Sequence, residues 1–224
     1  MTIFCFVFNK ISLALVSVMG HLFLDIETFS SSLDADSSLN PYKKGAKVIV
    51  IAYTYYNSFK PPLKEEAKPP VFLKEWESSE KAILEEFYCF LKKTSAVDQY
   101  LKIAGFNVTK FDLPYLFGRM NSLKIAPEEE LHDLLFRPFG VDLFQLTPII
   151  SEKTKKHGQL WGINHKEACN FFKLQEKEAN GLDCTKFYNE KNYEKIMEYC
   201  TQEFNFEQLL DCIYLHVMKN FHGK

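Results

Sequence analysis

The segment Lys47–Tyr56, with the sequence KVIVIAYTYY, constrains the fold more than any other part of the chain. Its β-branched and aromatic residues are the types that favour a strand. Leu22–Ile26 is predicted to be a second strand, apolar up to Asp25 and therefore buried on both faces. Val71–Trp76 and Tyr100–Ala104 are predicted to be further strands. A central sheet therefore organises the predicted fold.

Helical patterns lie between and after these strands. Ser78 and Ser79 precede the first of them, and serine is well suited to cap a helix. The predicted helices span Glu80–Lys93, Asp112–Leu123, Asn164–Phe172 and, as one long final helix, Asn192–Met218. Strands followed by alternating helices and strands indicate an α/β fold, in which helices flank a mixed sheet.

Loops are predicted where turn-forming and charged residues gather. Pro, Ser, Asp and Asn mark Ser30–Tyr42, and prolines and lysines mark Phe59–Pro70. Ser151–Gly158 is predicted to be a basic loop, whereas Val141–Leu146 is ambiguous between strand and helix. The charges of the basic loop are either simply solvated or positioned to track phosphates; they are Lys153, Lys155, Lys156 and His157.

Charge and cysteine content exclude several classes of protein. The formal net charge of −2 and the pI near 6.3 give no global basic field, so any nucleic-acid surface must be local. The lack of a basic field argues against a pure nucleic-acid-binding module more than against an enzyme, because an acidic site loaded with metal attracts phosphates itself. The six cysteines form no CxxC pair, and a chain of 224 residues needs no disulfide scaffold. His165 and Cys169 have a spacing that zinc can use, but reduced, buried thiols in a cytoplasmic protein are favoured.

The first residues of the chain are interpreted separately from the rest. Residues 1–18 form an apolar leader that Asn9 and Lys10 interrupt, too broken for a membrane helix and without the features of a signal peptide. We interpret Met19 as a natural start and residues 19–224 as one domain. A chain that begins at Met19 is therefore expected to fold and to keep its activity, and no membrane association is expected.

Two acids end the first predicted strand. Asp25 and Glu27 are two residues apart, so strand alternation aims both side chains at one face of the sheet. Neighbouring carboxylates raise each other's pKa, and a divalent cation commonly offsets this cost. The alternative is a strand that simply ends in exposed acids.

Three residues further along the chain have settings that permit a role at the same site. Asp112 opens a predicted helix after a Gly/Asn turn, where an acid serves equally well as a helix cap. Tyr199 and Glu203 are four residues apart and therefore share one face of the final helix. Each observation by itself also fits an ordinary structural role.

Together, these segments resemble the three motifs of the DEDD exonucleases of the type with a tyrosine in the third motif. Asp25-Ile-Glu27-Thr28 resembles the first motif, and the N-x-x-x-F-D pattern of Asn107–Asp112 resembles the second. Tyr199-x-x-x-Glu203 resembles the third, except that the family has Asp where this chain has Glu203. The similarity is nearest to stand-alone exonucleases related to the proofreading domain of family-B DNA polymerases, and it covers roughly residues 20 to 215.

The resemblance implies an RNase H-like fold and two divalent cations, Mg²⁺ or Mn²⁺, held by Asp25, Glu27, Asp112 and Glu203. It implies that Asp25 bridges both cations and that Tyr199 orients the attacking water or helps to deprotonate it. Residues expected near the substrate are Thr28, Phe29, Asn107 and Phe111. Asp142 is expected to support the site structurally.

The activity that the resemblance implies is 3′–5′ hydrolysis of phosphodiester bonds at a free 3′ end, with single-stranded DNA favoured as the substrate. Two alternatives remain open at this point. The first is an RNA-directed exoribonuclease of the same superfamily. The second is a nucleic-acid-binding module that has lost catalysis, marked by the change to Glu203.

Overall fold

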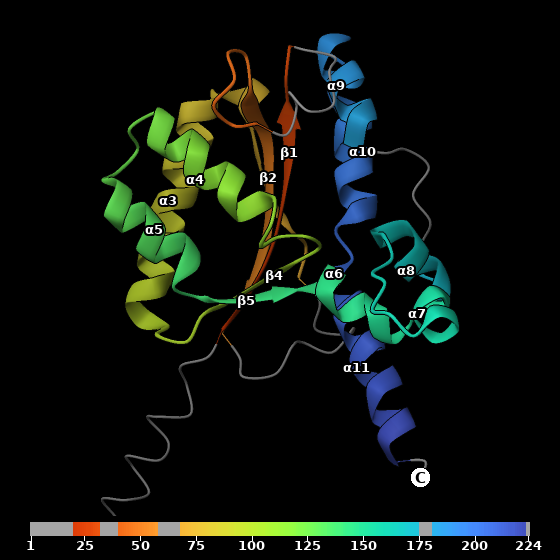
Figure 1. The fold of residues 1–224 in the computed structure, drawn as a ribbon. Coiled ribbons are helices and arrows are strands. Elements are labelled where there is room, and N and C mark those ends of the chain that lie inside the picture. Colours follow the sequence, from red (N-terminus) through yellow and green to blue (C-terminus); the bar gives the residue numbers. More distant parts are fainter. Residues whose placement is uncertain (1–19, 32–39, 58–67, 175–180, 223–224) are drawn as a thin grey trace, which may run out of the picture.

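A five-stranded mixed sheet with helices on both faces forms the centre of the protein (Figure 1). The computed structural model describes residues 20–31, 40–57, 68–174 and 181–222. The sheet order is β3-β2-β1-β4-β5; β1 pairs antiparallel with β2 and parallel with β4, so the sheet is mixed. The strands are β1 (His21–Phe29), β2 (Lys47–Tyr56), β3 (Val71–Lys74), β4 (Lys102–Gly105) and β5 (Phe139–Asp142). The predicted α/β class is confirmed.

Strand β1 lies at the middle of the sheet and serves both of its faces. Leu22, Leu24 and Ile26 point into one hydrophobic cluster, whereas Phe23 belongs to a cluster on the opposite face. Because side chains alternate along a strand, the acids that follow Phe23 at every second position point to its side of the sheet.

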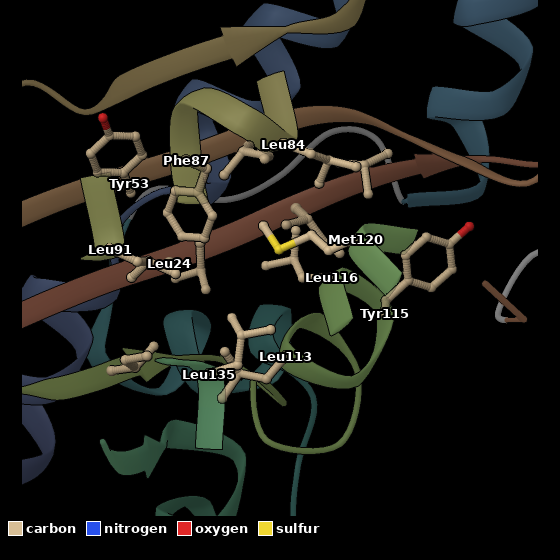
Figure 2. Packing of buried hydrophobic residues seen from close by; sticks show 14 of the residues in the cluster. Leu24, Tyr53, Leu84, Phe87, Leu91, Leu113, Tyr115, Leu116, Met120 and Leu135 are labelled. Carbon is tan, nitrogen blue, oxygen red and sulfur yellow. The ribbon is translucent and has the colours of Figure 1, made fainter. Parts of the chain in front are cut away.

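Three helices cover the face of the sheet that Leu22, Leu24 and Ile26 share. These are α3 (Glu80–Val97), α4 (Asp112–Ser122) and α5 (Glu128–Phe136), which stand together on one side of the sheet in Figure 1. Figure 2 shows their packing: Leu84 and Phe87 from α3 and Leu116 and Met120 from α4 surround Leu24. Phe87 and Leu116 are completely buried, so this is the main core of the protein.

The remaining helices cover the opposite face of the sheet (Figure 1). They form two clusters, one around Phe23 and Phe206 and the other around Ile49, Tyr199 and Cys200. Among the described residues, none of the helices combines the length and the apolar character that a membrane crossing needs. The helices are α6 (Leu143–Leu146), α7 (Glu152–His157), α8 (His165–Phe172), α9 (Gly181–Asn189), α10 (Tyr193–Glu203) and α11 (Phe206–His222), with short 3-10 turns at η2 (Glu75–Glu77) and η3 (Thr147–Ile149).

Most predicted elements lie within a few residues of the observed ones, and Lys47–Tyr56 agrees at both ends. The basic loop Ser151–Gly158 is a wrong prediction, because its residues form the short helix α7. Ser151 caps this helix by accepting the N–H of Thr154, and Gly158 ends it with a φ of 66°. The leader, and residues 32–39 and 58–67 of the two other predicted loops, lie outside the described residues.

The predicted single helix Asn192–Met218 is also wrong, because helix α10 ends at Glu203 and a separate helix, α11, begins at Phe206. Ile196 and Cys200 pack into one buried cluster, whereas Leu209 and Ile213 pack into another. On one straight helix these two pairs would point roughly 140° apart, since they are 13 residues apart and each residue turns a helix by about 100°. The break lets each half bury its own apolar face.

A buried ion pair anchors the helix that carries Asp112. Arg119 on α4 donates to both carboxylate oxygens of Glu80, with N–O distances of 2.8 Å, and also to the carbonyl oxygen of Pro41. The same carboxylate accepts the backbone N–H of Val48 in β2 at 2.9 Å. Glu80 thus joins α3, α4 and β2 at one point.

We predict that Arg119→Ala lowers the free energy of unfolding by about 3 kcal/mol, because removing one partner leaves a largely buried carboxylate without its compensating charge. Urea unfolding followed by circular dichroism measures this change. Arg137→Ala, at an exposed position, is the matched control and should change the stability by less than about 0.5 kcal/mol. Equal losses in the two variants would contradict the anchoring role.

Candidate active site

Three carboxylates meet on the face of the sheet that Phe23 shares. Oxygen atoms of Asp25, Glu27 and Glu203 lie within 4.8 Å of one another. Glu27 is only 7% exposed, and the side chain of Glu203 is 13% exposed. Among the described residues, this is the one group of acids, histidines and cysteines with the geometry to hold a metal ion.

Strand β1 positions the first two acids. Asp25 lies opposite the small residue Ala52 of β2, and the register between these strands shifts just after Glu27, between Glu27 and Thr28. Gly105 lies close to the strand on its other side, since a Cβ atom there would be 2.5 Å from the carbonyl oxygen of Leu24. Glycine at this position therefore lets β4 and its following turn approach β1 directly beside Asp25.

Helix α10 brings Tyr199 and Glu203 to the same place from far along the chain. The two side chains are one turn apart, and the Tyr199 hydroxyl hydrogen-bonds to the Glu203 carboxylate. Burial and then the charges of Glu27 and Glu203 raise the pKa of Tyr199 far above its ordinary value of 10.0. Tyr199 is therefore a protonated hydrogen-bond donor.

Asp112, the fourth predicted ligand, lies next to the group of three rather than inside it. Its carboxylate accepts the backbone N–H of Ile26 at 3.0 Å, which places it beside the strand residue between Asp25 and Glu27. The pairing of β1 with β4 ends at Phe23 and Ala104, so Asp112 satisfies a strand N–H that β4 does not reach.

Burial raises the pKa of Asp112 to about 8, the hydrogen bond from Ile26 opposes this shift, and the charges of Glu203 and Asp142 add to it. The carboxyl group of Asp112 is therefore held in an environment that disfavours its charged form. A cation placed beside it would reverse that preference.

Asp142 has a structural role next to Asp112, of the kind that the sequence resemblance implied. Its carboxylate accepts the backbone N–H groups of Asn107 at 2.9 Å and Thr109 at 3.2 Å, and it caps α6 through Phe144. Asn107 has a φ of 63°, a conformation that asparagine tolerates better than most residues. Asp142 thus holds the turn that leads to Asp112.

The other residues predicted near the substrate lie at different places in the fold. Thr28 and Phe29 continue β1, and the Phe29 ring packs on that of Tyr188, with a centroid distance of 4.8 Å. Phe111 precedes α4 and lines an open cavity of about 360 Å³ together with Pro41, Tyr42, Lys110, Pro114, Tyr115, Phe117 and Phe136. Phe29 therefore lies on the strand that carries Asp25 and Glu27, and Phe111 directly precedes Asp112.

Two buried thiols lie beside the carboxylates. Cys184 on α9 hydrogen-bonds to Glu27, and burial, followed by the charges of Glu27 and Asp25, raises the pKa of Cys200. Buried thiols were expected in general, but the place of Cys184 beside Glu27 was not, because α9 was not predicted. Both thiols stay protonated, so Cys184 is a hydrogen-bond donor to Glu27.

His165 and Cys169, whose spacing zinc could use, contact each other without forming a metal site. The Sγ of Cys169 lies 3.5 Å from Nε2 of His165, and both residues are buried. They hydrogen-bond to Asn205 and complete no group of metal ligands among the described residues. The prediction of reduced, buried thiols therefore fits better at this position.

The chemistry of the group of three carboxylates suits a hard divalent cation. Mg²⁺ and Mn²⁺ prefer carboxylate oxygens to thiolates or imidazoles. Three acids crowded into a half-buried position repel one another, and a cation removes that repulsion. The residues therefore fit the cofactor that the sequence resemblance implied.

The sheet order, the covering helices and the acidic cluster define an RNase H-like α/β domain with a candidate metal site. The profile of the family described as "DNA polymerase family B, exonuclease domain" matches residues 17–143, more than half of the chain. The chain belongs to this family, which confirms the predicted kinship with DEDD exonucleases. The matched range contains Asp25, Glu27 and Asp112 but ends before Tyr199 and Glu203.

A comparison with solved structures extends the similarity beyond the matched range. The family B DNA polymerase from the hyperthermophilic archaeon Pyrobaculum calidifontis is similar over 85% of this chain, with a TM-score of 0.58 and 16% sequence identity. At that identity, the likeness shows the fold. The chain spans 24% of the length of that polymerase. No curated protein sequence matches this chain closely enough to indicate a relationship.

The raised pKa of Asp112 predicts how stability depends on pH when cations are removed by chelation. Because the folded state holds this proton more tightly than the unfolded state, stability should fall as the pH rises towards 8. We expect the free energy of unfolding to decrease by roughly 3 kcal/mol between pH 5.5 and pH 8. Denaturation with urea at each pH measures the change.

Asp112→Asn is the matched variant, because it keeps an oxygen for the Ile26 N–H and has no proton to lose. Its stability should be flatter over the same range of pH. Parallel pH profiles for the two proteins would contradict the assignment to Asp112.

Proposed function

We propose that this chain is a metal-dependent 3′–5′ exonuclease that removes nucleotides from the 3′ end of nucleic acid, with single-stranded DNA as its substrate. The observation that carries this proposal is the convergence of Asp25, Glu27 and Glu203 within 4.8 Å, in a chain of the family B exonuclease family. Glu203 comes from outside the range that the family profile matches, so its arrival at the same site supports the proposal independently.

Asp25, Glu27 and Glu203 would hold one divalent cation, and Asp112 together with Asp25 would hold a second. When bound, such cations supply Lewis acidity that activates water and stabilises the leaving 3′ oxygen. Asp25 would be the acid shared between the two groups, the role that the sequence resemblance implies for it.

Tyr199 acts in this proposal as an orienting group and not as a base. Its hydroxyl keeps its proton and donates to Glu203, so it limits the directions in which that carboxylate can point. Of the two roles that the sequence resemblance implied for Tyr199, orienting the water is therefore the one we propose.

Substrate binding is proposed to use two aromatic residues, Phe29, which follows Glu27 on β1, and Phe111, which precedes Asp112. Phe29 and Phe111 offer flat surfaces on which unstacked bases can lie, a mode of binding that tolerates any sequence. The Asn107 turn, held by Asp142, would set the distance between Phe111 and the acids. Bases must leave a duplex to stack in this way, so a single-stranded end is the expected substrate.

The test of this function is digestion of oligonucleotides labelled at the 5′ end, with matched DNA and RNA sequences. We expect a ladder shortened from the 3′ end when Mg²⁺ or Mn²⁺ is present and no cleavage when excess chelator is added. Faster digestion of the RNA would favour the exoribonuclease alternative. Absence of cleavage of both, at every cation concentration, would support the module without catalysis.

Asp25→Ala should abolish this cleavage, since it removes the acid shared by both groups. Asp133→Ala, which changes an exposed acid on α5, is the matched control and should cleave like the parent protein. Cleavage by Asp25→Ala at the parent's rate would assign the activity to a contaminating nuclease or to another site.

The third motif generates a separate prediction, because Glu203 is longer than the family's Asp by about one carbon–carbon bond, ~1.5 Å. We predict that Glu203→Asp retains or raises the rate, whereas Glu203→Gln lowers kcat at least about 100-fold by removing the charge. Tyr199→Phe should lower kcat more than it raises KM. Steady-state kinetics on one oligonucleotide measure all three variants.

Glu198→Gln, at an exposed position on the same helix, is the control for general damage to α10. If Glu203→Gln cleaves as well as the parent, Glu203 binds no cation and the third motif is misassigned.

A further inference from the structure

Helix α7 and the segment that follows it present positive charge and exposed apolar surface together. The α7 patch, as we call it, consists of Lys153 and Lys156 on the helix and of Leu160 and Trp161 after it. We propose that the α7 patch binds the single-stranded part of the nucleic acid whose 3′ end reaches the carboxylates. This inference takes the kind of strand from the proposed function and therefore rests on it.

The charge of α7 is unbalanced. Its six residues include three lysines, Lys153, Lys155 and Lys156, but one acid, Glu152. Glu152 pairs with Lys155 at 2.7 Å, and among the described residues no acid forms an ion pair with Lys153 or Lys156. These two lysines are three residues apart, which makes them neighbours on the helix surface. The structure therefore leaves two adjacent ammonium groups for phosphates, one of the two roles that the sequence left open for this segment.

Trp161 distinguishes the α7 patch from an ordinary charged helix. Trp161 is 47% exposed and Leu160 is 83% exposed, although tryptophan is largely buried in most folds. The other tryptophan of the chain, Trp76, stacks on Tyr193 with a centroid distance of 4.7 Å. Among the described residues, no aromatic ring packs on Trp161. Its indole therefore presents apolar surface to solvent beside positive charge.

The backbone that carries Trp161 is fixed to α7. The Trp161 N–H donates to the hydroxyl of Thr154 at 2.8 Å, and the same hydroxyl donates to the Trp161 carbonyl oxygen at 3.2 Å. Two residues later, the Ile163 N–H donates to the hydroxyl of Thr147 at 2.9 Å. A ring on a fixed backbone loses little freedom when a ligand stacks on it, so less of the binding free energy is lost to ordering.

The α7 patch is joined to the carboxylates by a continuous line of contacts on one face of the sheet (Figure 1). Gly162, which follows the tryptophan, lies against the Phe144 ring, since a Cβ atom there would be 2.6 Å from it. The Phe144 ring lies 5.9 Å from that of Phe106, and the Phe106 ring lies 5.1 Å from that of His165. His165 in turn lies 3.9 Å from Glu203. The patch and the carboxylates thus belong to one part of the molecule, as a strand that contacts both requires.

The chemistry of the α7 patch fits a single strand of nucleic acid. An exposed indole can stack on an unpaired base, whereas a duplex keeps the faces of its bases inside the stack. Lysines beside an aromatic ring are the combination by which proteins bind single strands of any sequence. A membrane surface is the less suitable partner, because a helix that lies in a membrane needs an apolar face and α7, with the sequence EKTKKH, has no apolar residue.

Separate variants remove the charge and the ring of the α7 patch. Lys153→Gln combined with Lys156→Gln removes two charges, and Trp161→Ala removes the ring. Trp161→Phe keeps a ring that can stack. Lys81→Gln combined with Lys93→Gln is the matched control, because both lysines are exposed on α3, on the opposite face of the sheet.

Binding of a fluorescein-labelled oligothymidylate to the full chain, measured by anisotropy in excess chelator, is the primary readout. We expect the double variant Lys153→Gln/Lys156→Gln to bind about 10-fold more weakly at low salt. The slope of log Kd against log salt concentration should fall by about 1.4, because each phosphate contact on a single strand contributes about 0.7. The α3 control should bind like the parent protein.

Trp161→Ala should weaken binding about 10-fold, and Trp161→Phe should stay within about 3-fold of the parent. The oligothymidylate should quench the tryptophan fluorescence of the parent, and Trp161→Phe should lose most of that quenching while it still binds. The melting temperature of each variant checks its folding. At saturating oligonucleotide with Mg²⁺, kcat should be unchanged in all variants, because the α7 patch acts on binding.

The outcomes separate this inference from the proposed function. A parent protein that binds and cleaves, with the double lysine variant and Trp161→Ala equal to it in affinity, overturns the inference alone. A parent that binds no oligothymidylate in chelator overturns it as well. So does a blue shift of Trp161 fluorescence on vesicles of anionic phospholipid without quenching by the oligonucleotide, which would assign the patch to a membrane surface. Binding through the patch without cleavage at any Mg²⁺ or Mn²⁺ concentration supports the inference and contradicts the proposed function.

Discussion

The mutual repulsion of Asp25, Glu27 and Glu203 is the constraint around which this protein is arranged. Two of the acids are fixed by the most thoroughly paired strand of the sheet, and the third by a helix that ends directly at it. Hydrophobic clusters on both faces of the sheet provide the free energy that holds these charges together. The donors Tyr199 and Cys184 then lower the cost of burying the Glu203 and Glu27 carboxylates.

Local patterns in the sequence were sufficient for the sheet and for the first two motifs. Lys47–Tyr56 has no alternative to a strand, and alternation alone places Asp25 and Glu27 on one face. The break before Phe206 was missed because each of the two helices has a helical pattern of apolar residues by itself. That the two patterns face different ways becomes plain only from the two separate clusters into which they pack. The contact between His165 and Asn205 was likewise not predictable, because the two residues are distant in sequence.

The site is completed by contacts between parts of the chain that are far apart, and this explains the limits of motif recognition. The range that matches the family profile contains three of the four predicted ligands. Glu203 enters through α10, whose position depends on α9 and on the packing of Ile196 and Cys200 against the sheet. The sequence resemblance could propose this third motif, but only the fold shows that it lies beside the first motif.

The hydrogen bond from Ile26 to Asp112 has a consequence for how related chains are compared. Asp112 closes an open edge of the central strand, so folding alone is a sufficient reason for a relative to keep an acid or amide there. Its presence in another chain is therefore weak evidence of catalysis, even though it belongs to the second motif. Glu203 satisfies no comparable need of the sheet, and the third motif is the better place to look when active members of the family are to be told from silent ones.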